Sequence, residues 1–196
     1  MKKTTNQTFE TYNHRILWEA ADKNLQLATS SSNDRKYFAL GGMFLFFAAF
    51  EGYLNWLGTR IAPEVWEDER QFFSRAPYQG TIGKYRFLAK ILNLPVADAS
   101  KGPFQTLKKL RKLRDMVAHP KPEAGTRSVK VKEGHFPPHH QGNLAKNISP
   151  NAASEAKDHL KKLAEQLHSE AKRLYPDSVR ESEAFGSMLG YETTNA

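Results

Sequence analysis

Three side chains between residues 114 and 119 have the types and the spacing for chemistry on a phosphodiester. Arg114, Asp115 and His119 lie in segment 107–120, which reads Leu-Lys-Lys-Leu-Arg-Lys-Leu-Arg-Asp-Met-Val-Ala-His-Pro. A guanidinium offers two fixed N–H donors to phosphate oxygens, and an imidazole can take up or release a proton near neutral pH. Because the 2′-hydroxyl of RNA is itself a nucleophile, these groups are enough for RNA cleavage. Arg114 and His119 are therefore candidate catalytic residues, and Asp115 is placed to orient the imidazole.

The same segment predicts an amphipathic helix that ends at His119. Leu110, Leu113 and Val117 recur at helical spacing, and Pro120 disfavours the α conformation at the residue before it. The two candidate residues, five positions apart, point about 140° apart on a straight helix and are displaced by about 7.5 Å along its axis. Either the helix end unwinds, or a second copy of the chain supplies the complementary residue across a two-fold axis.

The run from Arg114 to His119 resembles the Arg-polar-x-x-x-His motif of HEPN domains, an all-helical nucleotide-binding fold of many prokaryotic toxins and defence ribonucleases. The resemblance covers roughly residues 33–120 and the last long helix. It implies a homodimer that cuts RNA without metal or cofactor in an interfacial cleft, leaving a cyclic phosphate and a 5′-hydroxyl. A protein antitoxin or regulator is a further partner that the resemblance allows. Lys121 stands where many HEPN toxins paired with nucleotidyltransferases have Tyr, so control by modification there is not expected.

Two polar residues interrupt the most apolar stretch of the chain. Glu51 and Asn55 are one turn apart among Phe, Leu, Ala and Trp residues, so each needs a polar partner if it is buried. Arg114 or Arg111 is the partner expected. Glu51 then either orients Arg114 for chemistry or forms an ion pair with only a structural role. In the structural alternative for the motif, Arg114 pairs with Glu51 and His119 caps its helix.

The charge of the chain favours an anionic partner. Its 196 residues carry 29 Lys and Arg against 21 Asp and Glu, which gives a formal net charge of +8 and favours nucleic acid, nucleotides or anionic surfaces. The residues expected to bind RNA phosphates are Lys108, Arg111, Lys112, Arg127, Lys130 and Lys132. With no cysteine, disulfides, thiolate nucleophiles and Cys-based zinc sites are excluded. The loop histidines His135, His139 and His140 lack a carboxylate or Cys at matching spacing, so no metal site is expected.

The pattern of apolar residues predicts an all-α fold in one domain. We expect a HEPN-like bundle of about five to six helices over 1–175, a small irregular or β-hairpin insertion near 125–148, and a loosely held or helical tail over 176–196. The predicted helices are 9–27, 34–61, a short one from Pro63, 81–93, one from about 104, and 150–175, the last with Ser149 as its cap and Pro150 at its start. Within the insertion, valines alternate with polar residues over 126–132, as in a half-exposed strand. The apolar run before Glu51 is shorter than a bilayer requires, and the N-terminus lacks the apolar core of a signal peptide. The sequence therefore predicts a cytoplasmic protein without a membrane partner.

Two functions fit these observations. The first is a metal-independent endoribonuclease of toxin or phage-defence type, with His119 and Arg114 acting across a homodimer cleft. The second is a non-catalytic HEPN-like dimeric module that uses the same cleft to bind a nucleotide or RNA, or its apolar helix to dimerise or to hold a partner protein.

Overall fold

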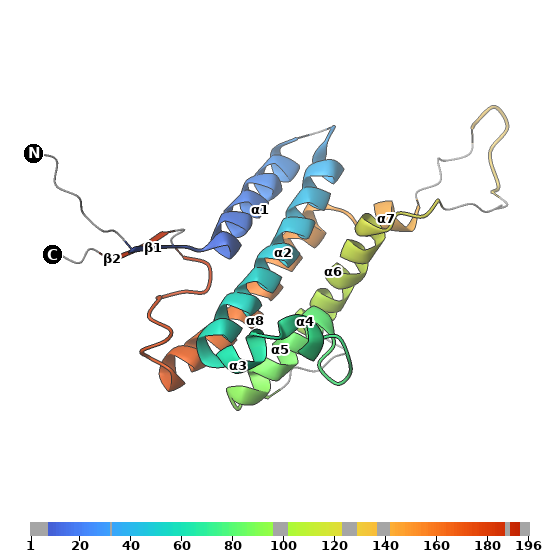
Figure 1. The fold of residues 1–196 in the computed structure, drawn as a ribbon. Helices are drawn as coiled ribbons and strands as arrows, with labels where there is room; N and C mark the ends of the chain where they lie inside the picture. Colours follow the sequence, from blue (N-terminus) through green and yellow to red (C-terminus); the bar gives the residue numbers. More distant parts are fainter. Residues whose placement is uncertain are drawn as a thin grey trace, which may run out of the picture.

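The fold is all-α, as predicted, with one short two-stranded sheet (Figure 1). The computed structural model describes residues 8–31, 33–95, 102–122, 129–136, 142–186 and 189–192. Within these segments five helices are long, and the other helices are single turns. The long helices are α1 (Asn13–Ser30), α2 (Arg35–Ile61), α5 (Gly80–Ile91), α6 (Gly102–Ala118) and α8 (Pro150–Leu174); the short ones are α3 (Pro63–Trp66), α4 (Glu69–Phe72) and α7 (Asn143–Lys146).

Helix α2 is the centre of the core. It contacts α1, α5, α6 and α8, and Phe46, Phe50 and Tyr53 on it are fully buried. Two glycines let α1 approach closely: a Cβ on Gly42 would lie 3.3 Å from a backbone oxygen, and one on Gly52 would lie 3.1 Å from His14. By length and composition alone α2 could cross a membrane, and 50% of its most apolar window is buried inside the protein. Its packing is that of a core helix.

Helices α6 and α8 pack against α2 and against each other, and α6 carries the predicted motif at its C-terminal end (Figure 1). α6 buries one face through Phe104, Leu107 and Leu110. α8 begins as its sequence predicts: the N–H of Ala152 donates to Oγ of Ser149 over 3.1 Å, and Pro150 occupies the first turn. The polar face of α6 is thereby fixed on a rigid element.

The two ends of the described chain correct the sequence prediction. The first helix begins at Asn13 and not at residue 9, because β1 (Thr8–Thr11) pairs antiparallel with β2 (Leu189–Glu192). The loosely held or helical tail predicted from residue 176 is also wrong over 176–186, which forms no helix and folds back on the bundle. Val179 and Ala184 are fully buried, and the ring of Phe185 stacks on Trp18 with centroids 3.8 Å apart. These contacts join residues that are far apart in sequence.

The insertion after α6 is irregular where the structure describes it. Residues 129–136 form no strand, and a turn lies at residues 133–134. The strand predicted from the Val alternation is therefore absent from 129–132, while 126–128 lie outside the described residues. Val129 and Val131 are exposed, so no apolar surface is available to make a hairpin pack. The short helix α7 was not predicted.

Candidate functional site at the end of helix α6

The motif lies at the C-terminal end of α6, and both candidate catalytic residues are open to solvent. α6 ends at Ala118, and the N–H of His119 donates the last helical hydrogen bond to the Asp115 carbonyl over 3.0 Å. The side chain of Arg114 is 39% exposed, and His119 is exposed. A phosphodiester can therefore approach both groups without any movement of the core.

Arg114 lies at the boundary between the polar face of α6 and the core. Its guanidinium carbon is 5.8 Å from the centre of the Phe47 ring, and its Nε is 3.4 Å from Oδ1 of Asp115. Within the described part of the chain, that buried Nε forms no hydrogen bond. Contact with an aromatic ring and a neighbouring carboxylate holds the guanidinium beside the helix.

The side chain of Asp115 contacts arginines and not the imidazole. Besides the contact with Arg114, its Oδ2 lies 4.0 Å from Nε of Arg111. Its only hydrogen bond with His119 among the described residues runs through the backbone. The predicted orientation of His119 by this carboxylate is therefore absent within one chain. Because Asp115 is 49% exposed, these ion pairs add little to stability and mainly hold the cationic side chains together.

Glu51 and Asn55 correct a second prediction, because their partners come from α5 and not from Arg114 or Arg111. Thr81 donates its hydroxyl hydrogen to Oε1 of Glu51 over 2.9 Å, and Nζ of Lys84 lies 3.9 Å from the same oxygen. Lys84 also donates to Oδ1 of Asn55 over 2.8 Å. The structural alternative for Glu51 is the one observed, with a different partner.

Lys84 is the centre of this polar cluster. Only 5% of the residue is exposed, and it pairs with Glu69 as well as with Glu51 and Asn55. Nε1 of Trp66 donates to the same Asn55 oxygen over 3.4 Å. The buried ammonium is fully engaged by oxygens of α2 and α4, which is the arrangement expected of a structural ion pair.

The predicted RNA-binding residues divide into three sets. Lys108, Arg111 and Lys112 lie on one side of α6, where with Ile82 and Asp115 they line an open depression of about 370 Å³. Lys130 and Lys132 are exposed in the irregular segment. Arg127 lies outside the described residues. The first set alone is placed beside the motif.

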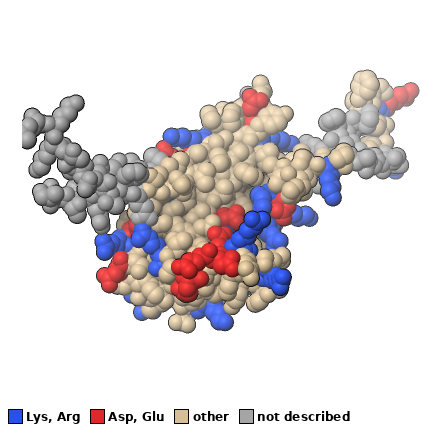
Figure 2. All heavy atoms as spheres, viewed as in Figure 1, with Lys and Arg blue, Asp and Glu red and all other residues tan. Residues whose placement is uncertain are grey.

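Charge is unevenly spread over the face shown in Figure 2. Lys, Arg, Asp and Glu gather over the lower part of the bundle and along α6, whereas the surface over α1 and α2 is largely free of charged groups. On α2, Leu40, Phe44 and Ala48 are only partly buried. An uncharged surface with half-exposed apolar side chains therefore lies next to the motif helix.

A larger cavity on the other side of α6 was not predicted. It has a volume of about 560 Å³ and lies between α6, the end of α7 and the start of α8. Lys109, Lys112 and Lys146 line it, with Met43 of α2 as part of its apolar lining. The spacing of Lys109 and Lys112 puts them one helical turn apart, which the sequence could have revealed. The position of Lys146 follows from the tertiary fold.

Metal ligands do not converge anywhere in the described ranges. No group of three His, Asp or Glu side chains in those ranges is placed to hold a metal ion. Nδ1 of His135 lies 3.2 Å from the backbone oxygen of Glu133, while His139 and His140 lie outside the described residues. The groups of this surface that can do chemistry are therefore its cations and its imidazole.

A second polar cluster is buried between α1, α2, α8 and the C-terminal segment. His14 and His168 are 3% and 1% exposed, and one ring nitrogen of each has no hydrogen-bond partner among the described residues. Burial, together with the nearby Arg15, lowers the pKa of His14 to about 4. The rings pack against Tyr53 and Trp56. Nε2 of His168 lies 3.0 Å from the backbone oxygen of Glu181, so this cluster fastens the C-terminal segment to the bundle.

Comparisons with protein-family models, with curated proteins and with solved structures found no match. The functional assignment therefore depends on the side chains of α6 and their surroundings. Those side chains comprise an exposed imidazole, a half-exposed guanidinium and a set of lysines and arginines on one rigid helix. Such groups can bind a phosphate and transfer a proton to or from it.

Proposed function

We propose that this protein is a metal-independent endoribonuclease of the toxin or defence type, acting as a homodimer through Arg114 and His119. The observation that supports the proposal most is the position of these two residues. Both are reachable by solvent at the end of α6, beside a depression lined by Lys108, Arg111 and Lys112. The resemblance of this segment to the HEPN motif supports the same assignment.

In the proposed reaction, the RNA supplies the nucleophile. One His119 imidazole takes the proton of a 2′-hydroxyl, and the freed oxygen attacks the adjacent phosphorus. The bond from phosphorus to the 5′-oxygen breaks, and His119 of the second copy returns a proton to that leaving oxygen. Arg114 donates hydrogen bonds to the non-bridging oxygens, on which negative charge grows. The products are a 2′,3′-cyclic phosphate and a 5′-hydroxyl.

A second copy of the chain is required because one helix holds only one imidazole and directs it away from Arg114. The largely uncharged surface over α1 and α2 in Figure 2 supports a dimer at this place. Leu40, Phe44 and Ala48 of α2 are only partly buried and leave some apolar area for a partner to cover. A two-fold axis near this surface brings two α6 ends toward one groove. We expect a dimer at micromolar concentration in sedimentation velocity, and a monomer there contradicts the shared cleft.

The decisive experiment measures cleavage of a single-stranded RNA in the presence of EDTA. Products are resolved on a gel and tested for a cyclic phosphate terminus. We expect His119→Ala and Arg114→Ala each to lower the rate by about 100-fold or more, because each removes proton transfer or charge stabilisation. His135→Ala and Arg70→Ala change exposed residues of the same types elsewhere and serve as matched controls. Equal rates in all five proteins exclude the proposal.

The binding module is the second candidate, and the contacts of Asp115 favour it. Its carboxylate lies against both Arg111 and Arg114, so it partly neutralises the cations that a transition state would use. If this function is the correct one, the wild-type protein binds RNA in a salt-dependent way but gives no cyclic phosphate product. Binding then survives in His119→Ala.

A further inference from the structure

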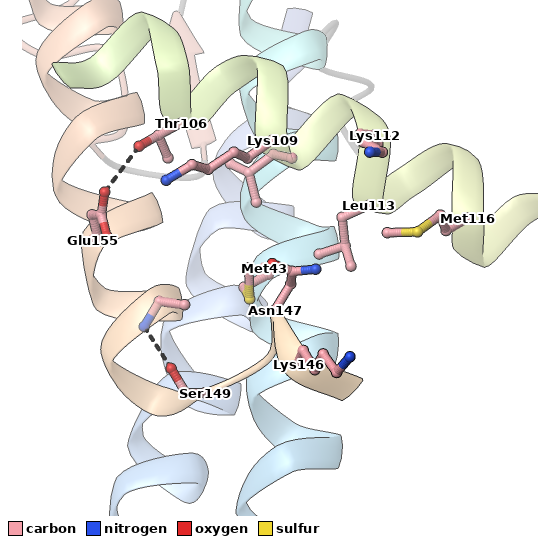
Figure 3. Close-up of a pocket in the computed structure, with 12 residues that line it drawn as sticks. Met43, Thr106, Lys109, Lys112, Leu113, Met116, Lys146, Asn147, Ser149 and Glu155 are labelled. Carbon is pink, nitrogen blue, oxygen red and sulfur yellow. Dashed lines mark hydrogen bonds between the residues drawn. The ribbon is translucent and has the colours of Figure 1, made fainter. Parts of the chain in front are cut away.

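The cavity beside α6 combines an apolar lining with a cationic rim (Figure 3). Met43, Leu110, Leu113 and Met116 supply the apolar surface, and the first three are nearly buried. Lys109 and Lys112 extend from α6 on one side, and Lys146 lies across the opening on α7 (Figure 3). A volume of about 560 Å³ lies within the range of pockets that hold a small organic molecule.

The lysines at this cavity have no anionic partner among the residues that the structure describes. No ion pair or hydrogen bond joins the side chains of Lys109, Lys112 or Lys146 to another described residue, and all three are exposed. The one carboxylate in the lining belongs to Glu155. It already accepts a hydrogen bond from Thr106 over 3.2 Å and lies 3.7 Å from Nδ1 of His159. Three lysines face this one carboxylate among the described lining residues, so the lining favours an anion.

The apolar part of the lining suits a flat ring. Met43 and Met116 present flexible thioether side chains, which adapt to aromatic surfaces more readily than branched residues do. A nucleotide has both required parts, a planar base for the methionines and a phosphate for the lysines. A base inside a double helix is stacked and paired, so only an unpaired nucleotide can enter such a cavity.

The cavity is also close to the motif and shares a residue with the basic depression. Lys112 lines both, and Met116 precedes His119 by about 4.5 Å along the axis of α6. A strand that places one base in the cavity can therefore continue past Lys112 toward Arg111 and Arg114. The start of α8 adds to the anion preference, because its first turn carries no acidic residue.

We infer that this cavity binds one unpaired nucleotide of a single-stranded RNA, with the base against Met116 and Met43 and the phosphates on Lys109 and Lys146. The site would select single strands and set the position of the cleaved bond. The inference relies on the proposed function only in taking RNA as the strand; the cavity, its lysines and its methionines are independent of whether cleavage occurs.

The test measures binding without cleavage. A fluorescent eight-nucleotide RNA with 2′-O-methyl groups cannot be cut, and its dissociation constant is followed by fluorescence anisotropy over a series of salt concentrations. We expect Lys109→Gln with Lys146→Gln to weaken binding roughly tenfold and to lower the salt slope by about 1.4, which is two lost phosphate contacts on a single strand. Lys161→Gln with Lys162→Gln makes the same charge change on an exposed part of α8 and is the control. Its effect should stay within about twofold.

A second variant tests the place of the base. Met116→Ala removes apolar surface from the half-buried lining without changing its charge, so it should weaken binding of the intact strand, with little effect on a strand that is abasic throughout. The inference fails if the cavity variant binds as tightly as the Lys161, Lys162 control, if duplex and single strand lose affinity equally, or if the wild type binds no strand. Loss of binding in the cavity variants without any cleavage by the wild type supports the cavity and removes the nuclease. If the wild type cleaves RNA but the cavity variants bind like the control, the nuclease is supported and the cavity is removed as a binding site.

Discussion

The bundle holds two kinds of lysine, which differ in their exposure to solvent and in their anionic partners. Lys84 is 5% exposed and is surrounded by Glu51, Asn55 and Glu69. Lys109 and Lys146 are exposed at the rim of a cavity and have no anionic partner in the part of the chain that the structure describes. The first kind of lysine completes the fold, whereas the second kind leaves charge available for another molecule.

The same difference separates charge that is satisfied inside the fold from charge that stays open to solvent. Glu51 lies on α2 among apolar residues, where an acidic group invites a catalytic interpretation, yet its contacts with Thr81 and Lys84 are internal to the fold. Arg114 has one close anionic neighbour, Asp115, and remains 39% exposed. Glu51 and Arg114 therefore differ in how far partners within the chain satisfy their charge, and residue type alone does not reveal this.

The sharpest test of the comparison removes the charge of Lys84 while keeping the volume of its side chain. Lys84→Met leaves the oxygens of Glu51, Asn55 and Glu69 without their shared cation, so the free energy of unfolding should fall by about 3 kcal/mol. Urea denaturation followed by circular dichroism measures it. Lys90→Met makes the same change at an exposed position of α5 and should cost less than about 0.5 kcal/mol.

A partial rescue makes this test more specific. Adding Glu69→Gln to Lys84→Met removes one of the carboxylates left unpaired, so the double variant should be more stable than Lys84→Met alone. Equal stability of the wild type and Lys84→Met contradicts a structural role for the buried lysine.

A smaller effect is expected from His14, a buried group that the fold keeps neutral. Its pKa falls from 6.5 to about 4 through burial, with Arg15 and His168 lowering it and Glu181 opposing them. The unfolded chain therefore binds more protons between these values, and stability decreases as the pH falls. Between pH 7 and pH 5 the loss from this residue should be about 2 kcal/mol.

His14→Phe removes the titration, so its free energy of unfolding should change less over the same pH interval. The comparison uses the pH dependence and not the absolute stability, because the larger ring also alters packing. His135→Ala removes an exposed imidazole and should keep the wild-type dependence. A steep pH dependence that persists in His14→Phe assigns the effect to other groups.

The sequence predicted the parts of the fold that depend on local periodicity. The bounds of α2 and α8 agree with the expected ones within a few residues, and the Ser149 cap and the end of α6 before Pro120 are confirmed. In each case the signal is internal to the helix: a repeat of apolar residues, a capping side chain or a proline.

The parts that were missed depend on contacts between distant segments. β1 is four residues long, and its partner β2 lies at the other end of the chain, so its local signal is weak. The partner predicted for Glu51 was wrong because pairing between helices depends on which helix covers α2 at that turn. That helix is α5. The cavity likewise requires α7 to lie opposite α6. Side-chain types were visible in the sequence, and their neighbours were not.

The smallest expected effect comes from the exposed lysines, and it completes the comparison with Lys84. Lys109→Gln with Lys146→Gln should leave the free energy of unfolding within about 0.5 kcal/mol of the wild type, because no partner among the described residues loses a contact. A slight gain is reasonable, since fewer like charges then face one another around the cavity. Urea denaturation of this variant and of Lys84→Met under identical conditions measures the contrast directly. A loss of several kcal/mol in the double variant would show that the lysines at the cavity are paired within the fold, and the charge there would no longer point to a ligand.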